Sequence, residues 1–313
     1  SCVKETEYGV PQGSILGPIL FLLYINDFSK CHEADSFLYA DDATVVTSDK
    51  NIESLREKTN TVLQNIYYWL NANKLSLNVA KSVFMMKTNK QNQQKKKKKI
   101  NNIPLTNVKE TKVLGVIIDD KLTFKSHIEH VTRKISKITY LIYRLKSFVP
   151  LTVIKTLYYS LAYPHLIYNI ITWGSASKTA TQSLIVQHKR LVRLLNNNSE
   201  YLEHTNPIFK KLQLLKLCDI YKLNIGMYMF KIINGIAPSI ITSEVYNNQI
   251  LHNHATRQAT DFIQKPQYTL EKSRNALTYK GPDIWNNFPQ YIRNSLTPVI
   301  FKNRLKKYLL SAY

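Results

Sequence analysis

Two adjacent carboxylates, Asp41 and Asp42, are the residues of this sequence with the clearest potential for chemistry. They lie between two short apolar runs, 37–39 and 43–46, which predict strands joined by a tight hairpin turn. Two carboxylates at one turn repel each other, and a bound divalent cation offsets that repulsion. An ordinary solvated hairpin tip explains an isolated acidic pair more simply. Asp119 and Asp120, which also end a predicted strand, show how readily the pattern arises.

A second candidate is the glycine- and proline-rich loop Gly9-Val10-Pro11-Gln12-Gly13, which runs into Ser14 and an apolar helical pattern. Glycine has no Cβ, so the backbone there can approach a nucleotide closely, and the Gln12 amide can pair with a base or sugar edge. The start of a helix just beyond the loop favours a nearby phosphate. The alternative is a connector that needs glycine and proline only for its turn. The loop by itself does not decide between the two.

Other periodic patterns predict the elements that must position these residues. Helical spacing of apolar residues predicts helices near 15–28, 51–73, 126–145, 151–172, 180–196, 206–234 and 298–310. Further strands are expected at 75–77, 83–86 and 112–118. Residues 87–104 are polar, lysine-rich and low in complexity, which predicts a loop or a disordered insertion.

The charge is distributed unevenly. Residues 1–86 carry a net charge of −3 and residues 87–313 a net charge of +25. So basic a second part implies a polyanionic partner, either nucleic acid or an anionic membrane surface. The apolar stretches 18–25 and 157–173 are too short or too interrupted to span a bilayer, and we expect no membrane partner. Cys2, Cys31 and Cys218 are far apart, which predicts no disulfide framework, no disulfide-linked partner and a reducing compartment.

Taken together, the ordered motifs are more specific than any one of them. GVPQGSILGPILFLLYIND followed by FLYADD resembles the palm of reverse transcriptases of non-LTR (LINE-like, jockey-type) retrotransposons. The resemblance continues through Trp69, NKLSLN at 73–78, KVLGVIID at 112–119 and GPDIWN at 281–286. It implies an α+β fold: a partial polymerase palm over 1–122, with 87–104 as its lysine-rich loop. A helical thumb-like region over 123–200 and a mostly helical carboxyl-terminal region over 201–313 would follow.

The same resemblance implies catalytic roles. Asp41 and Asp42 would bind two Mg²⁺ ions that activate the primer 3′-hydroxyl and stabilise the leaving pyrophosphate. The resemblance implies that Lys81 donates a proton to the pyrophosphate, although a solvated lysine after a strand is at least as good an explanation. Pro11, Gln12 and Gly13 would line the pocket of the incoming dNTP.

Nucleic-acid contacts are implied as well, with an RNA template and a DNA primer or target as partners. Tyr39 would pack against the primer–template, and Leu114, Gly115 and Val116 would grip the primer end. The basic thumb helix would contact the duplex backbone through Arg133, Lys134 and Lys137. The run Lys95–Lys99 is more simply explained as a solvated loop.

This family's palm also needs a metal-binding aspartate upstream of the Gly-Pro-Gln loop, and the chain does not contain it. We therefore expect that the chain alone does not polymerise DNA. Two alternatives stay open: a catalytically dead, basic nucleic-acid-binding relic, and a reverse transcriptase like the maturases of group II introns. A ribonucleoprotein in the nucleus or cytoplasm is the expected location.

Overall fold

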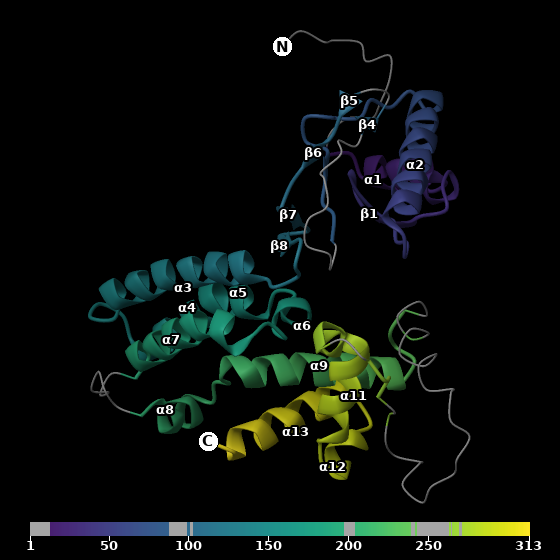
Figure 1. Ribbon diagram of the computed structural model, residues 1–313. Coiled ribbons are helices and arrows are strands. Elements are labelled where there is room, and N and C mark those ends of the chain that lie inside the picture. Colours follow the sequence, from purple (N-terminus) through teal and green to yellow (C-terminus); the bar gives the residue numbers. More distant parts are fainter. Residues whose placement is uncertain are drawn as a thin grey trace, which may run out of the picture. The chain divides into compact units, whose positions relative to one another are not determined.

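The computed structural model describes residues 13–87, 99–100, 103–196, 204–238, 242, 263, 265–268 and 271–313 (Figure 1). Helices and small sheets are both present and helices predominate, so the expected mixture of α and β structure is confirmed. The chain divides into two compact units, residues 1–111 and residues 112–313. Each unit is described by itself.

The first unit contains two helices, a hairpin and small strands. Its elements are α1 (Leu16–Ile25), the 3-10 turn η1 (Phe28–Lys30), β1 (Asp35–Tyr39), β2 (Asp42–Val46), α2 (Ile52–Ala72), β3 (Val83–Phe84), β4 (Lys99–Ile100), β5 (Ile103–Pro104) and β6 (Thr106–Asn107). Strands β1 and β2 pair antiparallel, β4 pairs antiparallel with β5, and β3 pairs parallel with β6. Figure 1 shows α2 as the long helix of this unit, with α1 and β1 beside it.

Local hydrogen bonds explain where the two helices begin. Just before α1, Oγ of Ser14 accepts a bond from the Gly17 amide at 3.0 Å, and Asn51 caps α2 by accepting from the Glu53 amide at 3.0 Å. Ile25 and Phe28 then pack against Val62 and Ile66 to form a small core. This core supports one face of the β1–β2 hairpin.

The predicted strand at 75–77 is wrong, because its backbone caps α2 instead. Lys74 takes a left-handed φ of +53°, and the Leu75 amide donates to the Leu70 carbonyl at 2.9 Å. The Lys74 amide donates to the Asn71 carbonyl at 3.1 Å. This pair of bonds is the Schellman arrangement that ends many helices, and it uses amides that a strand would need for pairing.

The second unit begins with part of a hairpin and continues as helices. Its elements are β7 (Glu110–Val113, in this unit from Lys112), β8 (Val116–Asp119), α3 (Lys125–Leu145), α4 (Leu151–Leu157), the π-helical turn η2 (Tyr158–Ala162), α5 (Tyr163–Ile167), α6 (Ile170–Trp173), α7 (Lys178–Leu194), α8 (Thr205–Leu212), α9 (Leu217–Ile233), the 3-10 turn η3 (Glu271–Asn275), α11 (Leu277–Asn286), α12 (Gln290–Arg293) and α13 (Pro298–Ser311).

Two sequence predictions are corrected here. The single strand expected at 112–118 is two paired strands, β7 and β8, because Leu114 and Gly115 both adopt positive φ and turn the chain back. The single helix expected at 151–172 is broken into α4, η2, α5 and α6. Pro164 begins a new turn within it, and Asn169 has a left-handed φ of +49°.

One hydrophobic core holds the second unit together. The buried stripe of α3 (Ile128, Val131, Ile135 and Ile142) belongs to it, and α3 packs on α7. Helix α9 is apolar on nearly every side and contacts α5, α6, α11 and α13 (Figure 1). The core therefore includes residues from both of the predicted regions 123–200 and 201–313.

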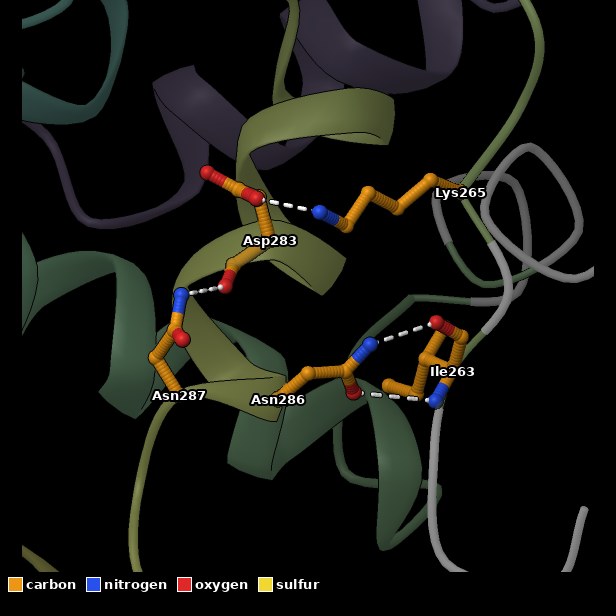
Figure 2. Close-up of polar contacts among 5 residues, drawn as sticks. All are labelled: Ile263, Lys265, Asp283, Asn286 and Asn287. Carbon is orange, nitrogen blue, oxygen red and sulfur yellow. Dashed lines mark hydrogen bonds and ion pairs between the residues drawn. The ribbon is translucent and has the colours of Figure 1, made fainter. Parts of the chain in front are cut away.

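The motif Gly281-Pro282-Asp283-Ile284-Trp285-Asn286 forms most of α11, and its residues have structural roles. A Cβ added to Gly281 would lie 2.5 Å from Sδ of Met229 on α9, and Trp285 stacks on Phe301 of α13 with ring centroids 5.5 Å apart. Figure 2 shows the polar side of the same helix. The Asn286 amide donates to the Ile263 carbonyl at 2.8 Å and accepts from the Ile263 amide at 3.0 Å. Lys265 forms an ion pair with Asp283 at 2.5 Å (Figure 2).

Candidate active site and nucleic-acid interface

The β1–β2 hairpin places the acidic pair at a solvent-exposed tip. Tyr39 pairs with Asp42, so the two-residue loop is Ala40-Asp41, one residue earlier than the predicted Asp41-Asp42 turn. Ala40 has a φ of +51°, whereas Asp41 has a negative φ, and a positive φ at the first loop position only is typical of type II′ hairpin turns. Asp41 therefore lies in the loop and Asp42 begins β2, and both carboxylates are exposed.

The two faces of this hairpin differ in their environment. Leu38 and Val45 point to the small core of the first unit. Phe37 and Tyr39 lie on the opposite face, where they are 62% and 67% exposed, and Asp42 is on this face because it pairs with Tyr39. An exposed aromatic face next to carboxylates is suited to stacking on a base or sugar while an ion is held near phosphates.

The acidic tip fits part of a magnesium site. Mg²⁺ in phosphate-processing sites is commonly held by one or two carboxylates together with waters and substrate oxygens. Asp41 and Asp42 offer two such carboxylates. Within the described ranges, no group of three or more His, Cys, Asp or Glu side chains gathers to form a fuller ligand set.

The other residues predicted for catalysis and nucleotide binding are only partly placed. Pro11 and Gln12 lie outside the described residues. Gly13 has a φ of +89°, and a Cβ built on it would meet nothing within 4 Å, so this position needs glycine for its backbone rather than for space. Lys81 is exposed in a turn, where its amide donates to the Asn78 carbonyl at 3.1 Å.

The residues predicted to grip a primer end lie at the β7–β8 hairpin turn. Leu114 is 46% exposed and Gly115 is also exposed, so both are accessible to a ligand. Val116 is only 2% exposed and belongs to the core of the second unit. Its side chain therefore serves packing, which leaves only its backbone for a contact.

Helix α3 presents a basic and aromatic stripe opposite its buried side. Arg133 and Lys137, for which phosphate contacts are predicted, are exposed, and Tyr140 and Arg144 continue the same line at helical spacing. Tyr140 is 64% exposed. We call these four residues the α3 stripe. Lys134 is exposed on the flank of the helix.

The individual contact residues predicted from the sequence were Arg133, Lys134 and Lys137, and they did not include Tyr140 and Arg144. The signal was available, since positions 133, 137, 140 and 144 repeat every three or four residues and alternate with the apolar positions of the same helix.

The electrostatic surroundings of α3 are positive. Burial lowers the pKa of His130, and the positive charges of Lys134, Arg133 and Lys112 lower it further. The pKa of His165 is lowered in the same way, by burial first and then by Lys134 and His130. Neighbouring cations that disfavour another positive charge favour a bound anion.

Asp119, in the second acidic pair, has a structural role. Asp119 accepts bonds from the amides of Thr123 at 3.0 Å and Phe124 at 2.7 Å, just before α3 begins. Burial acts to raise the pKa of Asp119, but these hydrogen bonds outweigh it and hold the pKa below its usual value. Asp119 therefore fixes the connection between β8 and α3 and has little capacity left for a metal ion.

Comparisons with known proteins show which family part of this chain resembles. Residues 2–118 match the family described as reverse transcriptase (RNA-dependent DNA polymerase). The curated relatives are RNA-directed DNA polymerases of mobile elements, which confirms the predicted resemblance to non-LTR retrotransposon enzymes. By family, therefore, the chain is related to an enzyme.

The particular relatives are insect transposon proteins. The RNA-directed DNA polymerase from mobile element jockey of Drosophila melanogaster is 25% identical over 262 residues, which cover 79% of this chain and 28% of the relative. The jockey polymerase of Drosophila funebris is 29% identical over 231 residues, 70% of this chain and 25% of the relative. The probable polymerase from transposon BS of Drosophila melanogaster is 26% identical over 63% of this chain and 23% of its own length. This chain thus spans about a quarter of the length of these relatives. No solved structure matches it.

Two further findings concern membrane and redox chemistry. None of the helices in the described part of the chain combines the length and the apolar character needed to cross a bilayer. Cys31 and Cys218 are both free thiols.

Proposed function

We propose that this chain supplies the acidic tip and the thumb-like nucleic-acid face of an RNA-directed DNA polymerase that extends a DNA primer on an RNA template. The observation that carries the proposal is the hairpin tip. A segment that matches the reverse transcriptase family presents Asp41 and Asp42 to solvent beside an exposed Tyr39.

Asp41 and Asp42 would hold Mg²⁺, which supplies positive charge against the phosphates of the incoming nucleotide. The residues around them would orient the substrate. Tyr39 offers an exposed ring for stacking on the primer–template, and Gly13 leaves its backbone open to the nucleotide. Since the described residues provide two carboxylates and no larger group, we propose that a complete site takes another ligand from outside them.

The second unit would hold the duplex. The α3 stripe has three cations on one exposed line and an aromatic ring between them, a combination that follows a phosphate backbone. The net charge of +25 over residues 87–313 strengthens the same attraction at long range.

Metal binding at the tip can be tested without catalysis, with Mn²⁺ as a paramagnetic probe. Added Mn²⁺ should broaden the amide resonances of residues 39–43, and the double variant Asp41→Asn, Asp42→Asn should abolish the broadening. Asp35→Asn is the matched control, because Asp35 is an exposed acid at the far end of the same hairpin, paired with Val46. Equal broadening in the double variant would contradict a metal site at the tip.

Nucleic-acid binding can be tested through its salt dependence. Replacing Arg133, Lys137 and Arg144 with Gln should make the slope of log K against log salt less steep by about 2 to 3, because each lost phosphate contact contributes about 0.9. The matched control replaces Lys178, Lys231 and Lys307, which are exposed cations on α7, α9 and α13. Equal effects of the two triple variants on the slope would argue against α3 as the contact face.

The alternative of a catalytically dead nucleic-acid-binding relic predicts a different pair of results. The salt-dependent binding would persist, but Mn²⁺ would not broaden the hairpin tip. Primer extension with Mg²⁺ on an RNA template completes the test. Synthesis that disappears in Asp41→Asn would show activity of the chain alone, against the expectation from its sequence.

A further inference from the structure

The turn between β7 and β8 has a backbone that its sequence does not favour. Leu114 has a φ of +45° and Gly115 a φ of +86°. Positive φ at both central positions is the type I′ pattern, in which asparagine and glycine are preferred and leucine is unfavourable. Because Leu114 is also half exposed, its own side-chain packing does not hold the turn, so another group must do so.

Tyr168, in the break between α5 and α6, contacts this turn directly. Its hydroxyl donates to the Leu114 carbonyl at 2.5 Å. A Cβ built on Gly115 would lie 3.2 Å from Cε1 of the same ring and 3.3 Å from its hydroxyl. The ring therefore covers the face of the turn that lacks a side chain, and its hydroxyl binds the carbonyl next to it.

Hydrogen bonds to its backbone hold Tyr168 in place. The Trp173 indole donates to the Tyr168 carbonyl at 2.8 Å, and the Tyr168 amide donates to the Pro164 carbonyl at 3.0 Å. Trp173 is fully buried, and Asn169 turns the chain with its left-handed φ. The tyrosine thus projects from a fixed backbone.

Trp173 also supports a second attachment of the hairpin. The ring of His127 packs edge-on against Trp173, with centroids 5.6 Å apart. His127 Nδ1 accepts a bond from the Ile117 amide of β8 at 3.4 Å. Tyr168 holds the Leu114–Gly115 turn and His127 holds strand β8. Both of these residues contact the buried Trp173, so both contacts with the hairpin depend on it.

We infer that Tyr168 is a positioning residue that fixes the Leu114–Gly115 turn relative to α3, so that a primer end bound at the turn keeps one register with the duplex on the α3 stripe. This inference rests on the proposed function. It adds a role for Tyr168, whose ring and hydroxyl act on the turn and which need not touch the nucleic acid.

The test compares the full chain with its Tyr168→Phe variant, which keeps the ring and removes the hydroxyl. Hydrogen exchange of the amides of 112–119 should become at least about fivefold faster, as expected when one hydrogen bond of ordinary net strength is lost. Tyr291→Phe is the control, since Tyr291 is an exposed tyrosine on α12 that accepts a hydrogen bond from Arg304 at its backbone carbonyl, which the substitution leaves in place. Unchanged exchange in Tyr168→Phe would overturn the inference.

A second measurement addresses the primer end. A primer with a photoreactive 3′-terminal base, annealed to RNA, should cross-link to 112–119 in the unsubstituted chain. The yield should fall more than about twofold in Tyr168→Phe, because a turn without this hydrogen bond aligns the primer end less often, while the affinity for the duplex stays within about twofold. Gly115→Ala, which would place a methyl group against the tyrosine ring, should lower the yield as well.

The outcomes separate the two proposals. If Tyr168→Phe speeds the amide exchange of 112–119 but leaves the primer cross-linking yield unchanged, the turn does not position the primer end, and the proposed duplex binding is unaffected. Failure of the unsubstituted chain to bind any primer–template would overturn the proposed function, and the exchange result would still decide whether Tyr168 fixes the turn.

Discussion

A buried histidine makes the stability of the second unit depend on pH. His188 on α7 is 1% exposed, its Nε2 lies 3.0 Å from the hydroxyl of Tyr158, and Phe209 packs edge-on against its ring. Burial lowers its pKa from the ordinary 6.5 to about 4. The folded protein thus keeps His188 neutral over a range in which the unfolded chain protonates it.

The sign and size of the effect follow from proton linkage. At pH 5 the unfolded chain carries a proton on nearly every His188, whereas the folded unit carries one on about a tenth of them, so lowering the pH favours unfolding. The stability contributed by neutral His188 is complete above about pH 6.5, falls as the pH drops, and is lost near pH 4. Between pH 7 and pH 5 the free energy of unfolding should decrease by about 2 kcal/mol on this account.

Urea unfolding followed by tryptophan fluorescence can measure this. A Trp69→Phe background leaves Trp173 and Trp285, which report on residues 112–313 alone. His127 also has its pKa lowered to about 4, by burial and then by His130 and Lys134, so part of the pH dependence is not due to His188. The test compares the free energy of unfolding of the Trp69→Phe protein with that of the Trp69→Phe, His188→Gln protein. The difference between these two free energies should decrease by about 2 kcal/mol from pH 7 to pH 5. If the free energy of unfolding of both proteins fell equally between pH 7 and pH 5, the pH dependence could not be assigned to His188.

Two further predictions concern polar contacts that hold segments in place. Asn286→Ala removes both side-chain bonds to the Ile263 backbone, so the free energy of unfolding should fall by about 2 kcal/mol in urea titrations. The side chain of Asn287, which follows α11, donates to the Asp283 carbonyl of that same helix, so an equal loss in Asn287→Ala would contradict a special role for Asn286. Asp119→Ala removes the acceptor of the Thr123 and Phe124 amides and should cost about 1 to 2 kcal/mol, with faster amide exchange at the start of α3. Asp120→Ala is the matched control, and equal exchange in both variants would argue against capping by Asp119.

The long amphipathic helices were predicted well from the sequence, because apolar residues at helical spacing lie on one face of a helix and that face is buried. Helix α3 begins at Lys125 and α2 at Ile52, within one residue of expectation. The family resemblance came from ordered motifs and is confirmed. The metal, nucleotide and nucleic-acid roles assigned to single residues stay predictions.

What the sequence could not give were features set by backbone conformation. Lys74 and Leu114 adopt left-handed angles although neither residue type favours them, so their identity did not predict the end of α2 or the β7–β8 turn. Asn169 favours such angles, but asparagine also occurs within helices, so it did not by itself predict the break before α6. The role of Tyr168 depends on a contact with Leu114, a residue 54 positions earlier in the chain. Likewise, Val116 resembles any strand residue until the core that buries it is known.

The central place of α9 has a consequence for how the second unit is made during translation. Helices α3 and α7 can pair soon after they leave the ribosome, since both lie early in the unit and pack on each other. Helix α9 is apolar on nearly all sides and contacts one of its main partners, α13, only after residues 298–311 have been synthesised. Until then its uncovered surface is a site for chaperone binding or aggregation, so premature termination anywhere before α13 should yield an insoluble product rather than a shorter working domain.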